Sequence, residues 1–219
     1  MEDEILMEDK TFSVSLAKNP IISIKVIPGH FTTSNAHFSH YLDVSGMKSN
    51  ALVARDVARE LAIPYLTSTL VDTIVCMEKT AVIGAYLAEE LLHAGTSVIN
   101  SGGEIRVVTP IGNVDGKLVF QDNMIEWITN RNIILIVASV SSGRTLNSAL
   151  ECLAYYGGRI AGISALFLAS PDVQEHKINA LFTSEDIPDY IVYSPSLCEM
   201  CKAGVKLDAV ISSEGYMKY

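Results

Sequence analysis

The chain has 219 residues, of which 49% are hydrophobic and 19% are charged, and its net charge is −9. This composition predicts one globular domain with a sizeable core and excludes a disordered chain. An acidic surface repels phosphate backbones, so nucleic acid is not expected as a partner. The first ten residues, MEDEILMEDK, lack the apolar segment of a signal peptide, and no stretch reaches the roughly 18 apolar residues of a membrane span. We therefore expect a cytoplasmic protein without a membrane partner.

The first predicted elements are two strands and a helix. Residues 1–10 are expected to form a solvated tail or a short helix start. The β-branched run 21–27, IISIKVI, predicts a strand that ends at the turn signal Pro28-Gly29. A second strand is expected over 38–44. Apolar residues recur every four positions within 49–62, which predicts an amphipathic helix.

The middle of the chain continues with short strands around one buried helix. VDTIVC at 71–76 has the length of a strand, and 80–93 predicts a largely buried helix. A short strand is expected at 97–100. The segments 104–110 and 116–122 flank a glycine-containing turn and predict a β-hairpin.

Strands and helices alternate more regularly in the second half of the chain. A short helix is expected at 123–129, and the uninterrupted apolar run 133–138 predicts a central parallel strand. A helix over 144–156 and a buried strand over 159–169 follow, with two further strands near 180–183 and 190–193. This alternation predicts an α/β fold, a mainly parallel sheet flanked by helices, whose ligands bind beyond the carboxyl ends of the strands.

A small-residue loop follows the strand 133–138 and precedes the helix. Backbone N–H groups at a helix start, hydroxyl donors and a glycine together favour phosphate binding. The residues proposed for this phosphate cradle are Ser141, Ser142, Gly143, Arg144 and Thr145. The alternative is ordinary helix capping by Ser141 or Ser142. The chain contains no GxxxxGK[ST], GxGxxG or GxSxG motif, which argues against nucleotide-triphosphate, dinucleotide and hydrolase sites.

The segment IILIVASVSSGRTL, residues 133–146, resembles the phosphoribosyl-pyrophosphate (PRPP) signature of type I phosphoribosyltransferases. VDTIVCMEKTAVIGAYLAEEL resembles the earlier pyrophosphate-binding loop of the family, with Glu78, Lys79 and Thr80 at loop positions. FTTSNAHFSHYLDV resembles the N-terminal hood segment of orotate phosphoribosyltransferases, and YYGGRIAGISALF resembles the strand after the phosphate loop. The resemblance implies a hood segment at 1–45, an α/β core at 46–219, and a homodimer active in pyrimidine nucleotide metabolism.

The PRPP signature is degenerate at the positions that hold the ribose. Ala138 and Ser139 stand where the family has two acidic residues that bind the ribose hydroxyls. Losing two charge-assisted hydrogen bonds weakens binding by about two to four powers of ten. The pyrophosphate loop opens with Cys76 in place of glycine. The region that corresponds to the basic flexible loop of the family has only Arg106, and the predicted hairpin tip adds Lys117. Asp43, Asp72 and Glu104 are the carboxylates considered as substitutes.

The cysteines and histidines offer no complete metal site in the sequence. Cys198 and Cys201 form a single CxxC, whereas a structural zinc site needs four ligands. Cys76, Cys152 or a second subunit could complete it; a redox pair and two plain thiols are the alternatives. We therefore assign no metal ligand. The histidines His30, His37 and His40 lie in the hood segment, where His37 or His40 could contact a base.

Three functions remain open from the sequence. The first is an orotate-type phosphoribosyltransferase that acts on PRPP and a nucleobase, with Mg²⁺ as the implied cofactor. The second is a non-catalytic sensor that binds PRPP or a nucleotide through its 5′-phosphate. A partner-binding protein that kept only the fold is a third reading. No catalytic residue is assigned.

Overall fold

The structure is a computed structural model that describes residues 10–93, 99–112, 117–169, 176–212 and 215–218. The expected N-terminal tail and the tip of the predicted hairpin lie almost wholly outside these ranges. No helix within them is long and apolar enough to cross a membrane.

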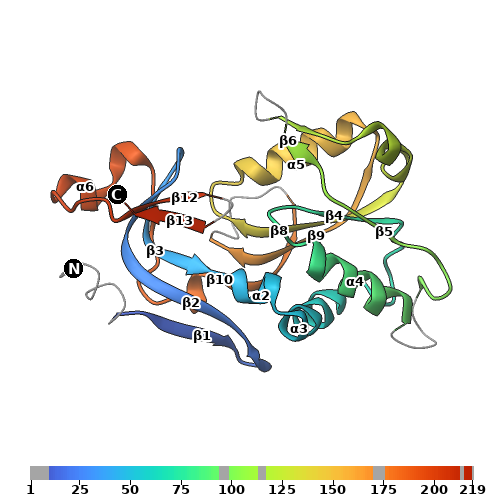
Figure 1. Cartoon of the computed structure of the whole chain (residues 1–219), viewed down its shortest axis with the longest axis horizontal. Coiled ribbons are helices and arrows are strands. Elements are labelled where there is room, and N and C mark those ends of the chain that lie inside the picture. Colours follow the sequence, from blue (N-terminus) through green and yellow to red (C-terminus); the bar gives the residue numbers. More distant parts are fainter. Residues whose placement is uncertain (1–9, 94–98, 113–116, 170–175, 213–214, 219) are drawn as a thin grey trace.

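A five-stranded parallel sheet forms the centre of the protein (Figure 1). Its order is β10-β9-β8-β4-β5, with bounds Ile178–Thr183, Arg159–Leu168, Asn132–Val140, Thr73–Cys76 and Arg106–Val108. The predicted α/β class is confirmed. β8 is the central strand, and its residues 133–138 are buried because both faces of the sheet are covered.

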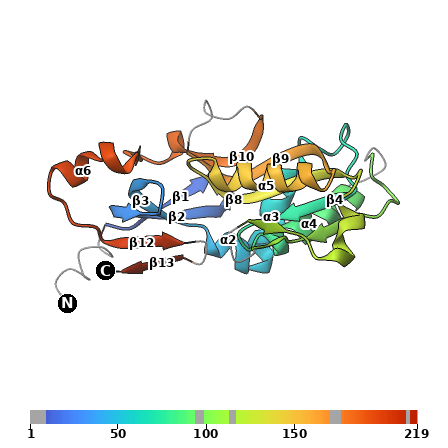
Figure 2. The ribbon, with the colours of Figure 1, turned by 90° about the horizontal axis from the view of Figure 1, so that it is seen from above.

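Helices cover both faces of this sheet (Figure 2). Alternate residues of β4 and β8 point to opposite faces. Ile74 and Ile134 pack with α3 (Ala51–Ala62) and α4 (Ala81–His93), while Val75 and Leu135 pack with α5 (Arg144–Tyr155). The short helix α2 (Ser45–Ser49) precedes α3. The predicted helices 49–62, 80–93 and 144–156 are confirmed within one or two residues.

A second, six-stranded sheet forms the hood beside the core (Figure 1). Its order is β11-β3-β2-β12-β13, with β1 on β2, and the bounds are Val192–Tyr193, His37–Asp43, Asn19–Thr32, Ala209–Ser212, Gly215–Lys218 and Phe12–Leu16. Both ends of the chain thus build the hood. The predicted hood segment, residues 1–45, does not include these C-terminal strands. The strand expected near 190–193 is β11, which also belongs to the hood.

Three local predictions are wrong. Pro28-Gly29 does not end the first strand; β2 continues to Thr32 through a register irregularity, where proline is tolerated. In the strand expected at 97–100, Ile99 and Asn100 lie in a turn, and residues 97 and 98 lie outside the described ranges. Residues 106–108 pair with β4 in the core sheet, so the hairpin is reduced to β6 (Ile111–Gly112) and β7 (Leu118–Val119).

The remaining elements are short. The helix expected at 123–129 is the 3₁₀ helix η1 (Asp122–Trp127). The C-terminal region contains η3 (Ser184–Asp186), η4 (Pro195–Leu197) and α6 (Glu199–Lys202). The last two lie in the connection between the hood strands β11 and β12.

The packing of α4 on β4 depends on Gly84. A Cβ atom at this position would clash with Cys76 Sγ in the core, whereas a Cβ at Gly46 in α2 would meet no atom within 4 Å. We expect Gly84→Ala to lower the free energy of unfolding by about 1–3 kcal/mol, because the core is close-packed. Urea unfolding measures the change, with Gly46→Ala as the matched control. Equal stability of the two variants would contradict this packing.

Candidate functional site

The predicted phosphate loop lies at the carboxyl end of β8. β8 continues to Val140, so the loop comprises residues 141–143 and not 139–143 as the sequence suggested. Gly143 is the N-cap of α5 and has a left-handed backbone with φ 74°. The N-cap is therefore a glycine rather than Ser141 or Ser142, the alternative that the sequence left open, and no side chain of the described residues caps the helix. The N–H groups of the first turn of α5 are therefore left for a ligand or water.

The side chains around this loop differ in their availability. Ser142 and Thr145 are exposed, and Ser141 is half-buried. The guanidinium of Arg144 donates a hydrogen bond from Nη1 to Asn35 Oδ1 at 2.7 Å. Asn35 lies in the turn between β2 and β3, so Arg144 connects the phosphate loop to the hood. A phosphate at the start of α5 would compete with Asn35 for this cation.

The two positions without acidic side chains receive a carboxylate from another loop. Glu78, in the loop between β4 and α4, accepts the backbone N–H of Ala138 at 2.8 Å and that of Ser139 at 3.2 Å. Both bonds go to Oε2. Among the described residues no hydrogen bond to Oε1 of Glu78 is found. A carboxylate thus sits at the end of β8 although Ala138 and Ser139 carry no charge.

The loop that carries Glu78 has an unusual backbone. Glu78 and Lys79 have φ values of 51° and 64°, a region that non-glycine residues enter at an energetic cost. The Lys48 ammonium donates to the Glu78 carbonyl at 3.1 Å. Thr80 is buried and donates its hydroxyl to the Met77 carbonyl, so its side chain supports the loop and does not face a ligand.

Two adjoining cavities separate the hood from the core at this edge. The charged cavity, of about 110 Å³, is lined by Asp43 of the hood and by Lys48, Glu78, Ala138 and Ser139 of the core, with other hood residues beside Asp43. The aromatic cavity, also about 110 Å³, is lined by Thr33, Phe38, His40, Tyr41, Leu42, Val44, Ser139, Ser141, Phe167, Tyr190 and Ile211. Ser139 borders both. Polar and charged groups thus adjoin a site suited to a flat ring.

Of the three carboxylates considered as substitutes, only Asp43 lines the charged cavity. Asp72 accepts hydrogen bonds from the backbone and side chain of Asn132, at the amino ends of the parallel strands. Glu104 pairs with Arg106, whose guanidinium lies over the Trp127 ring at 5.2 Å. Asp72 and Glu104 therefore lie at the edge of the sheet opposite the site, and the Arg106 side chain is engaged there with Glu104 and Trp127.

The three hood histidines separate into two environments. His40 is buried and lines the aromatic cavity, with its Nδ1 at 2.8 Å from Ser39 Oγ. Burial lowers the pKa of His40, and the Asp189 carboxylate opposes this shift. A neutral imidazole can donate one hydrogen bond and accept another. His30 and His37 lie instead beside the C-terminal cysteines.

Other features lie outside this site. A larger cavity, of about 430 Å³, lies between β7 and α5 and is lined by Lys117, Tyr155 and their neighbours, without any residue of the loops above. Cys76 and Cys152 are buried in two separate apolar clusters of the core. Cys76 and Cys152 were two of the residues that could have completed a metal site with the CxxC. Their positions in the core rule this out.

No protein-family model matches the chain, and no curated protein matches it. Among solved structures, orotate phosphoribosyltransferase of Mycobacterium tuberculosis superposes with a TM-score of 0.51, at 10% identity, over 74% of this chain and 91% of its own. UMP synthase of Leishmania donovani gives 0.49 at 17% identity, over 69% of this chain and 32% of its own. Adenine phosphoribosyltransferase of Leishmania donovani gives 0.49 at 11% identity, over 74% and 78%.

The parallel sheet with its flanking helices is therefore the type I phosphoribosyltransferase fold. Within that fold, the orotate enzyme of Mycobacterium tuberculosis is one of the structures that the chain resembles. This chain spans about a third of the length of the Leishmania UMP synthase, at 32%. The fold that the sequence predicted is confirmed.

Sequence reasoning missed three residues of the site. Lys48, Asn35 and Tyr190 reach it from α2, from the hood turn and from the segment before β11. Asn35 lies within the hood segment FTTSNAHFSHYLDV but carries no signal of its own there, and Lys48 and Tyr190 belong to no local motif. A signal existed only for Lys48, as a basic residue shortly after the hood segment.

Proposed function

We propose that this protein binds a compound that carries a ribose 5′-phosphate, either PRPP or a nucleoside 5′-monophosphate, at the carboxyl end of β8. The observation that carries the proposal is the uncapped start of α5 behind the left-handed Gly143. Such a helix start presents N–H donors and a positive dipole end to an anion. Exposed hydroxyls of Ser142 and Thr145 add donors at the same place.

The neighbouring cavities account for the rest of such a ligand. The ribose would lie in the charged cavity, where Glu78 Oε1 and the Asp43 carboxylate can accept hydrogen bonds from hydroxyls. The base would lie in the aromatic cavity, between Phe38, His40 and Tyr190. Arg144 would turn from Asn35 to the phosphate, which would loosen one link between hood and core.

Binding without turnover is the function that this site supports best. Ala138 and Ser139 offer no side-chain carboxylate, and the Glu78 carboxylate already uses one oxygen on their backbone N–H groups. The second candidate is phosphoribosyl transfer to a nucleobase, which is the reaction of enzymes with this fold. It is favoured by Asp43, Glu78 and Lys48 in one cavity, because the two carboxylates suit Mg²⁺ as oxygen ligands. When bound, Mg²⁺ would neutralise the charge of a pyrophosphate group.

Titration calorimetry tests the proposal directly. The purified protein is titrated with PRPP plus Mg²⁺, and then with orotidine, uridine, adenosine and guanosine monophosphates. The matching nucleosides, which lack the phosphate, serve as controls. Binding of a phosphate ester but not of its nucleoside supports the proposal, and release of pyrophosphate from PRPP with a base would establish transfer. No heat from any phosphate ester would overturn the proposed function.

Restoring one carboxylate should show whether this site can hold the ribose of PRPP together with Mg²⁺. Ser139 is exposed and borders both cavities, whereas Ala138 is only 4% exposed and packs in the core. We expect Ser139→Asp to raise the affinity for PRPP by about tenfold with Mg²⁺ and to lower it without Mg²⁺, because a further negative charge then faces the pyrophosphate. The control Ala138→Asp should unfold more easily, since it buries a charge. A Ser139→Asp variant that is indifferent to Mg²⁺ would contradict a ribose and metal site here.

A further inference from the structure

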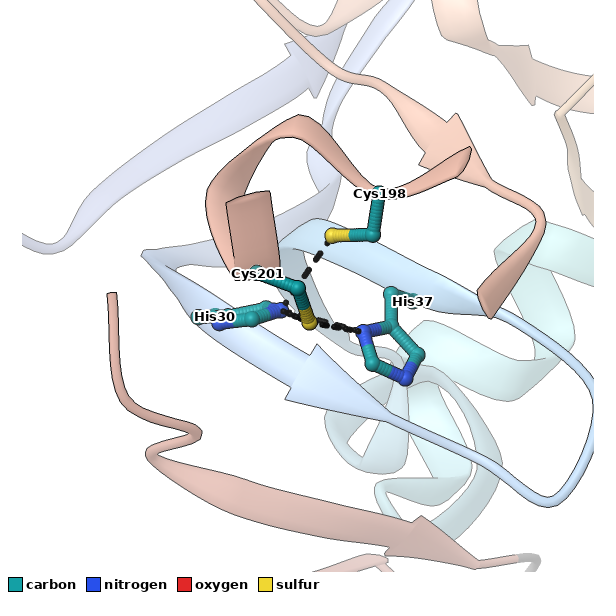
Figure 3. A group of neighbouring side chains, drawn as sticks. All are labelled: His30, His37, Cys198 and Cys201. Carbon is teal, nitrogen blue, oxygen red and sulfur yellow. Dashed lines mark hydrogen bonds between the residues drawn. The ribbon is translucent and has the colours of Figure 1, made fainter. Parts of the chain in front are cut away.

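Four potential metal ligands meet at the hood, from two segments that are far apart in the sequence (Figure 3). This Cys₂His₂ cluster consists of His30, His37, Cys198 and Cys201. Its ligand atoms all lie within 4.8 Å of one another. β2 and β3 provide the histidines, and the segment around the start of α6 provides the cysteines.

The distances within the cluster are those of a metal coordination shell. His30 Nε2 lies 3.1 Å from His37 Nδ1 and 3.4 Å from Cys198 Sγ. Cys201 Sγ lies 3.6 Å from His30 Nε2 and 3.3 Å from His37 Nδ1. A tetrahedron with the Zn–N and Zn–S bond lengths of proteins has edges of about 3.3–3.8 Å. The four atoms can therefore surround one ion with only small adjustments.

The hydrogen bond between His30 Nδ1 and a backbone carbonyl directs the other ring nitrogen, Nε2, into the cluster. Nδ1 of His30 lies 3.0 Å from the carbonyl oxygen of Val205, which can only accept a hydrogen bond. In the neutral ring Nδ1 then carries the proton, and Nε2 directs a lone pair into the cluster. A ring N–H donated to a backbone carbonyl is the usual orientation of histidines that bind metals.

The segment that carries the cysteines has little else to fix it. Within residues 194–207, Cys198 is the only buried residue, while Leu197 and Val205 are 64% and 47% exposed. Two hydrogen bonds fasten its end: the His30 N–H donates to the Asp208 side chain at Oδ2 at 2.7 Å, and the Asp208 N–H donates to the His30 carbonyl at 2.8 Å. A segment without its own apolar core commonly depends on a metal for its structure.

We propose that the Cys₂His₂ cluster binds one structural Zn²⁺ ion. Two thiolates and two imidazoles are a common ligand set for zinc, and four protein ligands leave no open position for catalysis. Binding releases the two thiol protons to solvent. The ion joins the hood strands β2 and β3 to the segment that precedes β12. The strand β12 pairs with β2, and its residue Ile211 lines both ligand cavities.

Metal analysis of the full chain, purified with a reductant, tests this assignment. Mass spectrometry of the metals should find close to one Zn²⁺ per chain. Replacement by Co²⁺ should give the visible bands of a tetrahedral site and a thiolate-to-metal charge-transfer band. Cys198→Ser and His37→Asn should each reduce zinc affinity by more than about tenfold, whereas Cys152→Ser, a thiol outside the cluster, should retain it.

The wild-type protein alone can decide the question if a variant does not fold. Chelation should lower its melting temperature by several degrees, and added Zn²⁺ should restore it. A folded wild-type protein that contains no metal and gives no Co²⁺–thiolate band would overturn the proposal. These readouts use no phosphate ligand, so the zinc assignment and the proposed function can fail separately.

Discussion

Gly143→Val is expected to weaken the binding of a ribose 5′-phosphate compound by at least about a hundredfold, because charge-assisted hydrogen bonds to the phosphate are lost. Gly143 has φ 74°, a conformation that costs an L-residue roughly 1–2 kcal/mol and a β-branched residue more. Valine should relax this turn and redirect the N–H groups at the start of α5. Calorimetry with the best ligand of the wild-type protein measures the loss.

Gly102→Val is the matched control for this substitution. Gly102 also has a left-handed backbone, with φ 75°, and a Cβ atom added there would meet no described atom within 4 Å. It lies outside both ligand cavities. It should show a similar backbone cost and unchanged ligand affinity. Thr145→Val, which removes one exposed hydroxyl without backbone strain, should weaken binding by a smaller factor. Unchanged affinity in a folded Gly143→Val protein would mean that the phosphate does not bind at α5.

The core of the fold could be predicted because its signals are local. The run at 133–138 is apolar throughout because β8 is covered on both faces. The apolar residues of α3 recur with the 3.6-residue period of a helix because only one of its faces is buried. The C-terminal hood strands had no such signal. β12 and β13 are short, β13 is largely exposed, and β12 pairs with β2 from the other end of the chain. Pairing of this kind is decided by tertiary contacts.

In the candidate site, too, only the features with a local sequence signal could be predicted. The loop before α5 follows from residue order alone, because a glycine and small polar residues come directly after a buried strand. The bonds from Glu78 to the backbone of residues 138 and 139 depend instead on two left-handed residues in a different loop. Likewise, the CxxC offers only two ligands, so no metal ligand was assigned from the sequence, and only the pairing of β2 with β3 brings His30 and His37 to Cys198 and Cys201.

Glu78→Gln is expected to abolish the preference of the protein for ribose over deoxyribose ligands. The amide oxygen of glutamine can still accept the N–H groups of residues 138 and 139, so the loop should keep its conformation. The charge that would bind ribose hydroxyls or Mg²⁺ is lost, and a hydrogen bond to a charged group contributes about 1.5–3 kcal/mol. A ribonucleotide should therefore bind about tenfold or more weaker, while its 2′-deoxy analogue and inorganic phosphate should change little.

Asp43→Asn provides the comparison that assigns the ribose contact. Asp43 lines the same cavity, but its Oδ1 accepts the backbone N–H of Ser45 at 2.9 Å, a bond that asparagine can also accept. If Glu78 holds the ribose, Asp43→Asn should preserve the discrimination between ribose and deoxyribose that Glu78→Gln removes. The reverse result would transfer the role to Asp43. Loss of phosphate binding in Glu78→Gln would show that Glu78 acts by supporting the loops, since a purely structural role affects every ligand alike.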